Sequence, residues 1–308
     1  MKALATFVMR GRSTAALVAA VAAVLLWLFP PFLIVSGAAL ALVTLRRGAA
    51  EGAWLMALAG VGAVALTGLT LGTPWPMLDV LPVYWLPLWL LALVLRATVS
   101  LSRAFQAAAL LGLLGVAGFY LVLGDPAIWW GEVLGQWERT LASLALSGQP
   151  AAADRATLDQ LLALLREWAP YLPGQAVGAV LLFVLAGLLL GRWHQSLLFN
   201  PGGFRPEFHQ LRLGSPLAAF TLGLFGAAML SGWPPLANAA LVLSLLYTVQ
   251  GVALVHAVAF KRRLSAAWLL LFYLLLMIPP LSQGVMALGV VDAWADFRNR
   301  IRPRSGQC

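Results

Sequence analysis

The stretch Leu236–Phe260, LANAALVLSLLYTVQGVALVHAVAF, contains no Asp, Glu, Lys or Arg. It is longer than the roughly 20 residues that an α-helix needs to cross about 30 Å of hydrocarbon. Other stretches of similar apolar character are Gly52–Leu71, Met77–Leu95, Ala104–Leu123, Tyr171–Leu190 and Pro216–Leu230. The sequence therefore predicts an all-α fold, a polytopic transmembrane helix bundle that forms one integral membrane domain over residues 1–308.

The composition of the whole chain agrees with this class. Of the 308 residues, 62% are hydrophobic and 10% are charged, whereas about a quarter of the residues of a soluble domain are charged. A soluble enzyme is therefore excluded. The net charge of +9 does not indicate nucleic acid as a partner, because the basic residues lie in short clusters between apolar runs, as membrane topology requires. The partner that the composition implies is the lipid bilayer.

The first and last apolar regions are interrupted by proline pairs. They are Thr14–Leu45, with Pro30-Pro31, and Ser265–Asp296, with Pro279-Pro280. Proline removes a backbone donor and clashes with the preceding helical turn, so each pair is expected to end one helix and begin another. Each region is then either a thin hairpin or a single kinked helix.

The distribution of basic residues favours hairpins. With ten segments and a cytoplasmic N-terminus, only Arg139, Arg155 and Arg166 of the 20 Lys and Arg residues lie outside, as the positive-inside rule requires. In the alternative of eight segments each region crosses once and both termini lie outside. We expect eight to ten segments in the bacterial cytoplasmic membrane, with both termini cytoplasmic.

Residues 124–170 form the one large stretch outside the apolar runs, and they are predicted to be an extracytoplasmic insertion. Apolar residues recur there at helical spacing in two groups: Trp130, Val133, Leu134, Trp137, Leu141 and Leu144, then Leu158, Leu161, Leu162, Leu165 and Trp168. Ser147-Gly148-Gln149-Pro150 separates them as a turn. This pattern predicts an outer pair of amphipathic helices on the membrane surface or over the bundle.

The sequence contains none of the motifs that mark common catalytic or nucleotide sites. G-x-x-x-x-G-K-[ST], H-E-x-x-H and G-x-S-x-G are all missing, so the chain has no ATPase site of its own. His194, His209 and His256 have no partner at the spacing of metal ligands. We expect no enzyme activity, no cofactor and no metal.

Polar and aromatic residues inside the spans are the candidate ligand-binding groups. Met77–Leu95 carries Asp79, Tyr84, Trp85 and Trp89 in its outer half, where flat surfaces with polar handles suit a ring-bearing or amphipathic ligand. A second set lies in Leu236–Phe260: Asn238, Tyr247 and Gln250. Such groups are costly against lipid, so they are expected to face the bundle, where they either bind a ligand or bond neighbouring helices.

Residues 195–215 form the most distinctive loop, predicted to be a cytoplasmic elbow. Asn200-Pro201-Gly202-Gly203 predicts a tight turn, and Phe204, Arg205 and Glu207 begin a short amphipathic segment. This segment is either a re-entry helix or a docking site for a cytoplasmic partner. Near the C-terminus, Asp292 and Asp296 share one helix face and are expected to pair with basic residues of the inner surface.

Asn200–Leu213 and Asp292–Arg298 resemble the YybS-like family of predicted bacterial inner-membrane proteins, whose function is not established. That family is similar to the substrate-binding subunits of energy-coupling-factor transporters, in which an alanine-rich first helix contacts the partner. Ala15, Ala19 and Ala23 would match that role here. Their four-residue spacing allows another helix to approach closely.

Two functional hypotheses follow. The leading one is a small-molecule-binding or transport-related subunit without its own ATPase, whose ligand enters from the outer side near Asp79, Tyr84, Trp85 and Trp89. The alternative is a membrane scaffold that binds lipid and recruits a membrane or cytoplasmic protein through the elbow. A homo-oligomer is compatible with both.

Overall fold

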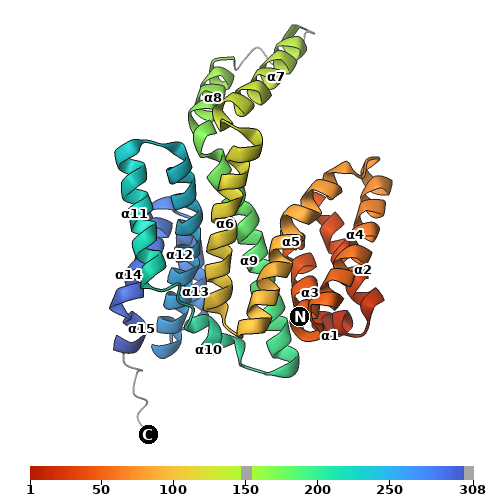
Figure 1. Cartoon of the computed structure of the whole chain (residues 1–308), viewed down its shortest axis with the longest axis vertical. Coiled ribbons are helices and arrows are strands. Elements are labelled where there is room, and N and C mark those ends of the chain that lie inside the picture. The colour runs from red at the N-terminus through yellow and green to blue at the C-terminus, as the bar shows by residue number, and fades with distance from the viewer. Residues whose placement is uncertain (147–154, 302–308) are drawn as a thin grey trace. The chain divides into compact units, whose positions relative to one another are not determined.

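A computed structural model describes residues 1–146 and 155–301, and all the regular elements in these ranges are helices (Figure 1). The all-α fold class is confirmed. The helices of the first half are α1 (Lys2–Met9), α2 (Arg12–Val24), α3 (Phe32–Arg47), α4 (Ala49–Leu71), α5 (Trp75–Thr98), α6 (Leu101–Leu123) and α7 (Pro126–Leu146). The second half contains α8 (Arg155–Trp168), α9 (Leu172–Phe199), α10 (Phe204–His209), α11 (Ser215–Ser231), α12 (Pro234–Lys261), α13 (Ala266–Leu276), α14 (Pro279–Ala295) and α15 (Phe297–Arg300).

Five helical segments of the described chain are long and apolar enough to cross a membrane: Ala49–Leu71, Trp75–Thr98, Leu101–Leu123, Gln160–Phe199 and Pro234–Lys261. Together α13 and α14 would make a sixth, but they are bent by 110° at the break before Pro279. These helices indicate a multi-pass integral membrane protein. The predicted count of eight to ten segments also includes helices shorter than the roughly 20 residues of a full span, such as α2 and α11.

The chain folds into two compact units. Unit 1 contains Met1–Leu111, Ala179–Phe220 and Ser244–Cys308, and unit 2 contains Gly112–Gly178 and Thr221–Leu243. The sequence predicts one integral membrane domain, whereas the contacts within the structure group the residues into these two units. The elbow and the C-terminal helices belong to unit 1, and the α7–α8 pair belongs to unit 2.

The first proline pair lies in the turn of a helical hairpin within unit 1. A short 3₁₀ turn ends at Trp27 and α3 begins at Phe32, so Pro30 and Pro31 lie between the helices, as their chemistry predicts. α2 packs directly against α3 and α4. This packing confirms the hairpin interpretation over a single kinked helix.

The alanine positions of α2 contact other helices of the same chain. Ala15, Ala19 and Ala23 are 2%, 1% and 0% exposed, and the buried hydroxyl of Ser36 donates to the carbonyl oxygen of Ala19 at 2.8 Å. The predicted close approach is made by α3 and α4. These three side chains are therefore covered within the folded chain, and their contact with a partner subunit stays a prediction.

Glycines allow α12 and α14 to pack closely. A Cβ atom on Gly251 would overlap the carbonyl oxygen of Val285, and one on Gly289 would overlap that of Tyr247. Both obstacles are backbone atoms, which cannot move aside as a flexible side chain does. Small residues at such positions allow membrane helices to approach each other. This contact fixes the second proline-broken region against α12.

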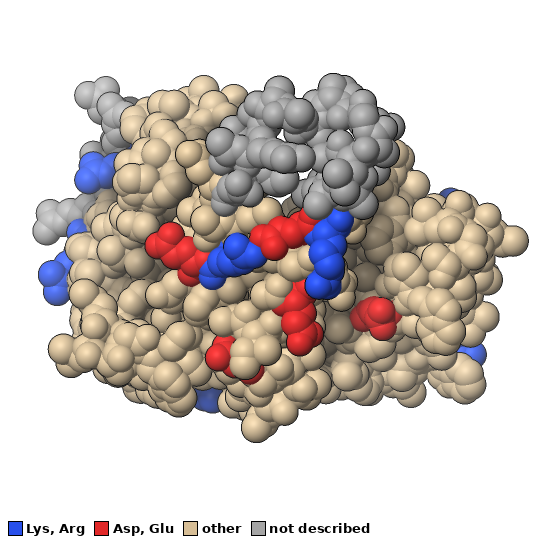
Figure 2. All heavy atoms as spheres, turned by 90° about the horizontal axis from the view of Figure 1, so that it is seen from above, with Lys and Arg blue, Asp and Glu red and all other residues tan. Residues whose placement is uncertain are grey.

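Unit 2 contains the predicted outer helical pair. α7 and α8 contact each other, and the side chains of Arg166 and Glu138 form an ion pair between them. The predicted turn at 147–150 and the side chains of Leu141, Leu144 and Leu158 lie outside the described residues. Figure 2 shows acidic and basic side chains adjoining one another on the face seen from above. Exposed pairs of this kind contribute about 0–1 kcal/mol each.

Candidate functional site

The predicted aromatic site on α5 is occupied by side-chain packing within unit 1. Tyr84 and Trp85 are 2% and 3% exposed. The Trp85 indole donates to the hydroxyl of Ser36 at 3.1 Å. The Tyr84 hydroxyl donates to the carbonyl oxygen of Phe183 at 3.3 Å. It also lies close to Gly187, because a Cβ atom added to that glycine would be 2.6 Å from the hydroxyl oxygen. Both polar handles are therefore used to join helices.

The other two predicted residues of α5 differ from this pair. Trp89 is partly exposed, and its indole donates to the carbonyl oxygen of Ala49 at 3.3 Å. Asp79 is exposed. None of the four α5 residues lines either of the two hollows described below. Their role in binding a ligand stays a prediction.

Asn238 joins four segments of unit 2. It is fully buried, and its side-chain oxygen accepts the backbone N–H of Gly174 at 2.7 Å. Its amide nitrogen donates to the Tyr120 hydroxyl at 2.7 Å and to the carbonyl oxygens of Pro170 and Pro234 at 2.7 and 2.9 Å. The predicted inward orientation is thus accounted for by bonds between helices.

Gln250 joins segments of unit 1 by hydrogen bonds in the same way. It is also fully buried; its side-chain oxygen accepts the backbone N–H of Leu213, and its nitrogen donates to the carbonyl oxygen of Gly289, both at 2.7 Å. The neighbouring candidate Tyr247 is fully buried as well. Gln250 therefore fastens the end of the elbow to α12 and α14.

The non-helical segment after α10 has its backbone groups bound by side chains. The Arg212 N–H donates to the Ser102 hydroxyl at 3.0 Å, and the Gln106 amide donates to the Leu213 carbonyl oxygen at 2.9 Å. Non-helical backbone that is buried in a membrane protein needs such partners because no water is present to satisfy it. Three polar side chains from α6 and α12 thus hold this segment in place.

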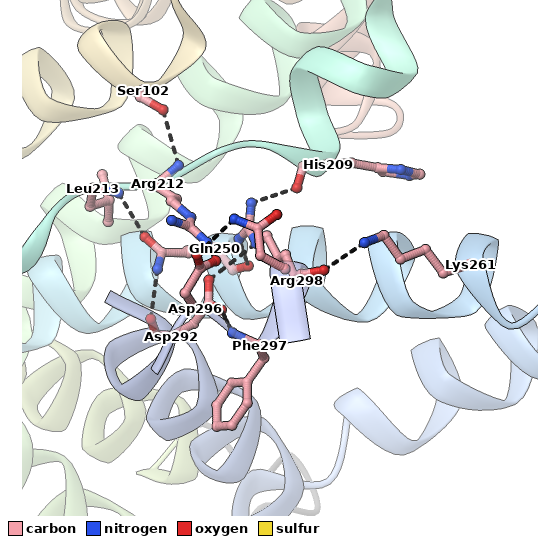
Figure 3. Close-up of polar contacts among 12 residues, drawn as sticks. Ser102, His209, Arg212, Leu213, Gln250, Lys261, Asp292, Asp296, Phe297 and Arg298 are labelled. Carbon is pink, nitrogen blue, oxygen red and sulfur yellow. Dashed lines mark hydrogen bonds and ion pairs between the residues drawn. The ribbon is translucent and has the colours of Figure 1, made fainter. Parts of the chain in front are cut away.

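Arg298 fastens the C-terminal segment to the same place (Figure 3). Its guanidinium forms an ion pair with Asp292 at 3.1 Å and donates to the carbonyl oxygen of His209 at 2.5 Å. Arg298 is 5% exposed and Asp292 is fully buried. Burial lowers the pKa of Arg298, and the Asp292 charge opposes that effect. A second pair joins Asp296 to Arg212, so the predicted pairing of both aspartates is confirmed.

The elbow itself begins with the predicted tight turn. Gly202 has φ of +87°, a conformation that favours glycine, and the Gly203 N–H donates to the Asn200 carbonyl oxygen at 3.0 Å. Helix α10 follows, with the rings of Phe204 and Phe208 stacked at 5.8 Å. The amphipathic helix predicted for this loop is therefore present.

Two charged residues of α10 contact the unit in different ways. Glu207 accepts a hydrogen bond from Arg192 of α9 at 2.8 Å. Arg205 lies over the ring of Phe260 at 5.1 Å, a cation–π contact. The acidic side of α10 thus faces another helix of the unit, and the basic side faces the end of α12.

The elbow, α9, α12, α13 and the C-terminal segment line an open cavity of about 1500 Å³. It is lined by basic side chains, aromatic side chains and two histidines. The basic residues are Arg205, Arg212, Lys261, Arg263 and Arg298; the aromatic ones are Trp193, Phe204, Phe208, Phe260 and Tyr273. No Asp or Glu is among the lining residues that the structure describes. We call this hollow the basic cavity.

Three of the five cations in the basic cavity are free of carboxylates. Within residues 1–146 and 155–301, Arg205, Lys261 and Arg263 make no ion pair, whereas the other two are paired as described above. The Lys261 ammonium donates to the carbonyl oxygen of Arg298 at 2.6 Å. A cavity with this excess of positive charge attracts anions.

The two histidines that line the basic cavity are His209 and His256. Burial, with a smaller contribution from nearby positive charges, lowers the pKa of His209 to about 4. In Figure 3 its imidazole points away from Arg298, although its carbonyl oxygen bonds there. His256 shares a hydrogen bond of 2.8 Å with the Tyr273 hydroxyl. No group of three potential metal-ligating side chains occurs among the described residues.

The sequence predicted a binding role for Arg205 and the elbow, but it did not predict that Lys261, Arg263 and Tyr273 lie beside the elbow. The signal was the basic run at 261–263 directly after an apolar span. Membrane orientation explains such a run fully, so it gave no separate indication of a binding site. The basic cavity becomes visible only when α10 and α13 are placed against the end of α12.

Known proteins offer no further guide to the basic cavity. No family model, curated protein or solved structure matches this chain. The resemblance to the YybS-like family stays a prediction.

Proposed function

We propose that this integral membrane protein binds a small anionic amphiphile in the basic cavity. The proposal develops the hypothesis of a small-molecule-binding subunit and moves its site from α5 to the elbow. The observation that carries it is the excess of cations: five basic side chains line the cavity and two of them are ion-paired.

The uncompensated charges are suited to a compact anion. Two unit charges 4 Å apart attract each other by about 1 kcal/mol in water and about 4 kcal/mol near a protein surface of lower effective dielectric. Arg205 and Arg263 add the planar donor geometry that matches phosphate and carboxylate oxygens. Such an anion would supply the negative charge that Arg205, Lys261 and Arg263 lack within the described chain.

The aromatic walls favour an amphiphile over an inorganic ion. Trp193, Phe204 and Phe208 line the basic cavity together with apolar residues of α9 and α12. Binding sites for small organic molecules are usually mainly apolar, with a few polar groups that fix the ligand's orientation. A transport-related role would use this binding step and would need a partner as its source of energy.

The test compares two adjacent arginines, of which one lines the basic cavity and the other does not. The protein is purified in uncharged dodecyl maltoside, and its unfolding temperature is measured as dodecyl phosphate is added. Arg263 lines the basic cavity, whereas Arg262 is exposed and lines neither hollow. Arg262→Gln is thus a control for Arg263→Gln with the same change of charge in the same loop.

We expect dodecyl phosphate to raise the unfolding temperature of the wild type and of Arg262→Gln. Arg263→Gln should bind about tenfold more weakly, which corresponds to about 1.4 kcal/mol. The absence of any response in the wild type, or equal responses of the two variants, would contradict binding in the basic cavity.

A further inference from the structure

A second hollow lies next to the basic cavity in unit 1. It is a groove of about 340 Å³, and all its lining residues are apolar. Its walls come from α12, α13, α14 and the C-terminal segment, with Val258, Trp268, Phe272 and Phe297 among them. We call this hollow the apolar groove.

Three elements line both hollows with adjacent residues. On α12, Ala257 lines the basic cavity and Val258 lines the apolar groove. The same division occurs between Tyr273 and Phe272 on α13. In the C-terminal segment Arg298 lines the cavity and Phe297 the groove. The two hollows therefore border the same three elements and are neighbours, although no residue lines both.

We infer that the ligand is a phosphate-bearing lipid whose headgroup occupies the basic cavity and one of whose acyl chains occupies the apolar groove. The inference rests on the proposed function, since it requires the basic cavity to bind an anion. It adds the class of ligand and the place of its chain.

Charge and polarity together select this occupant. Arg205, Lys261 and Arg263 provide more positive charge than a monoanion needs, which suits a phosphate monoester. The apolar groove offers no polar partner among its lining residues, so only hydrocarbon fits it without loss of hydrogen bonds. The positive-inside rule predicts that the basic cavity lies on the cytoplasmic side, where anionic phospholipids are concentrated.

The experiment compares a lipid with its headgroup alone. Native mass spectrometry from neutral detergent measures the binding of dioleoyl phosphatidic acid and of dioleoyl phosphatidylcholine. Titration calorimetry measures that of glycerol 3-phosphate, a soluble source of the same phosphate monoester. Trp268→Ala removes a wall of the apolar groove. Trp294→Ala is the matched control, because Trp294 is similarly exposed, at 50% against 57%, and lines neither hollow.

We expect phosphatidic acid to bind the wild type at least tenfold more tightly than either other ligand. Trp268→Ala should weaken phosphatidic acid about tenfold and leave glycerol 3-phosphate unchanged, while Trp294→Ala changes neither. A shorter-chain phosphatidic acid should bind the unmodified protein more weakly, which tests the groove without any substitution.

Other outcomes separate the two claims. Equal affinities for glycerol 3-phosphate and phosphatidic acid would overturn the lipid inference and leave the anion-binding function standing. Equal affinities for phosphatidylcholine and phosphatidic acid would overturn the role of the charged headgroup. Failure of both phosphate ligands to bind would overturn the inference and the proposed function together.

Discussion

Replacing Gln250 by leucine removes the side chain that fastens the elbow while keeping a similar volume. The Leu213 N–H then loses its acceptor at 2.7 Å in a buried place, which costs about 1–3 kcal/mol. The hydrogen bond to Gly289 is lost as well, at about 1 kcal/mol, since that carbonyl keeps its partner within α14. We expect the free energy of unfolding to fall by about 2–4 kcal/mol.

Equilibrium unfolding by SDS in mixed micelles measures this loss. The control is Thr248→Val on the same helix, whose hydroxyl donates only to the Ser244 carbonyl oxygen one turn away; it should change the free energy by less than about 0.5 kcal/mol. Limited proteolysis should also cleave the Gln250→Leu variant near residues 209–214. A Gln250→Leu protein as stable as the control would refute the fastening role of this side chain.

Three further perturbations test other parts of the fold. Gly289→Ala should lower the free energy of unfolding by about 1–3 kcal/mol in the same assay, because the added Cβ atom would overlap the carbonyl oxygen of Tyr247. Its control is Gly284→Ala on the same helix, where a Cβ would have no atom within 4 Å, and this change should be neutral or slightly stabilising. Arg298→Met should cost about 3–5 kcal/mol because it leaves the fully buried Asp292 without its charged partner. Adding Asp292→Asn should restore part of the loss, and a double variant less stable than the single one would contradict this. The pKa of His209 is lowered to about 4 in the folded protein, so the unfolded chain takes up the proton first and stability falls as the pH drops from about 6.5 towards 4. The unfolding temperature of His209→Asn should therefore decline less over this range than that of the wild type. Parallel declines of the two proteins would argue against the shift.

Local rules predicted the elements well. The proline pair at Pro30-Pro31 stops helical hydrogen bonding through its own chemistry, and the hairpin forms where the sequence places it. Asn238 and Gln250 were expected to face inward because lipid cannot satisfy them, and both are fully buried. These results depend only on a residue and its immediate surroundings.

The partners of these residues could not be predicted in the same way. Gln250 bonds Leu213 and Gly289, which lie 37 and 39 positions away in the sequence. The spacing of Ala15 and Ala19 indicates that some helix approaches closely, but it does not say which one. Periodicity describes the face of one helix, whereas a binding site depends on how several helices meet.

Photo-labelling offers the most direct test of the basic cavity as a ligand site. The protein in neutral vesicles is exposed to a phosphatidic acid that carries a diazirine in one acyl chain, and labelled peptides are mapped. The account predicts labels in 254–272, at Leu288 and in 297–301, reduced several-fold by Arg263→Gln and unchanged by Arg262→Gln. Labels spread evenly over the apolar helices, with equal yield in both variants, would contradict it.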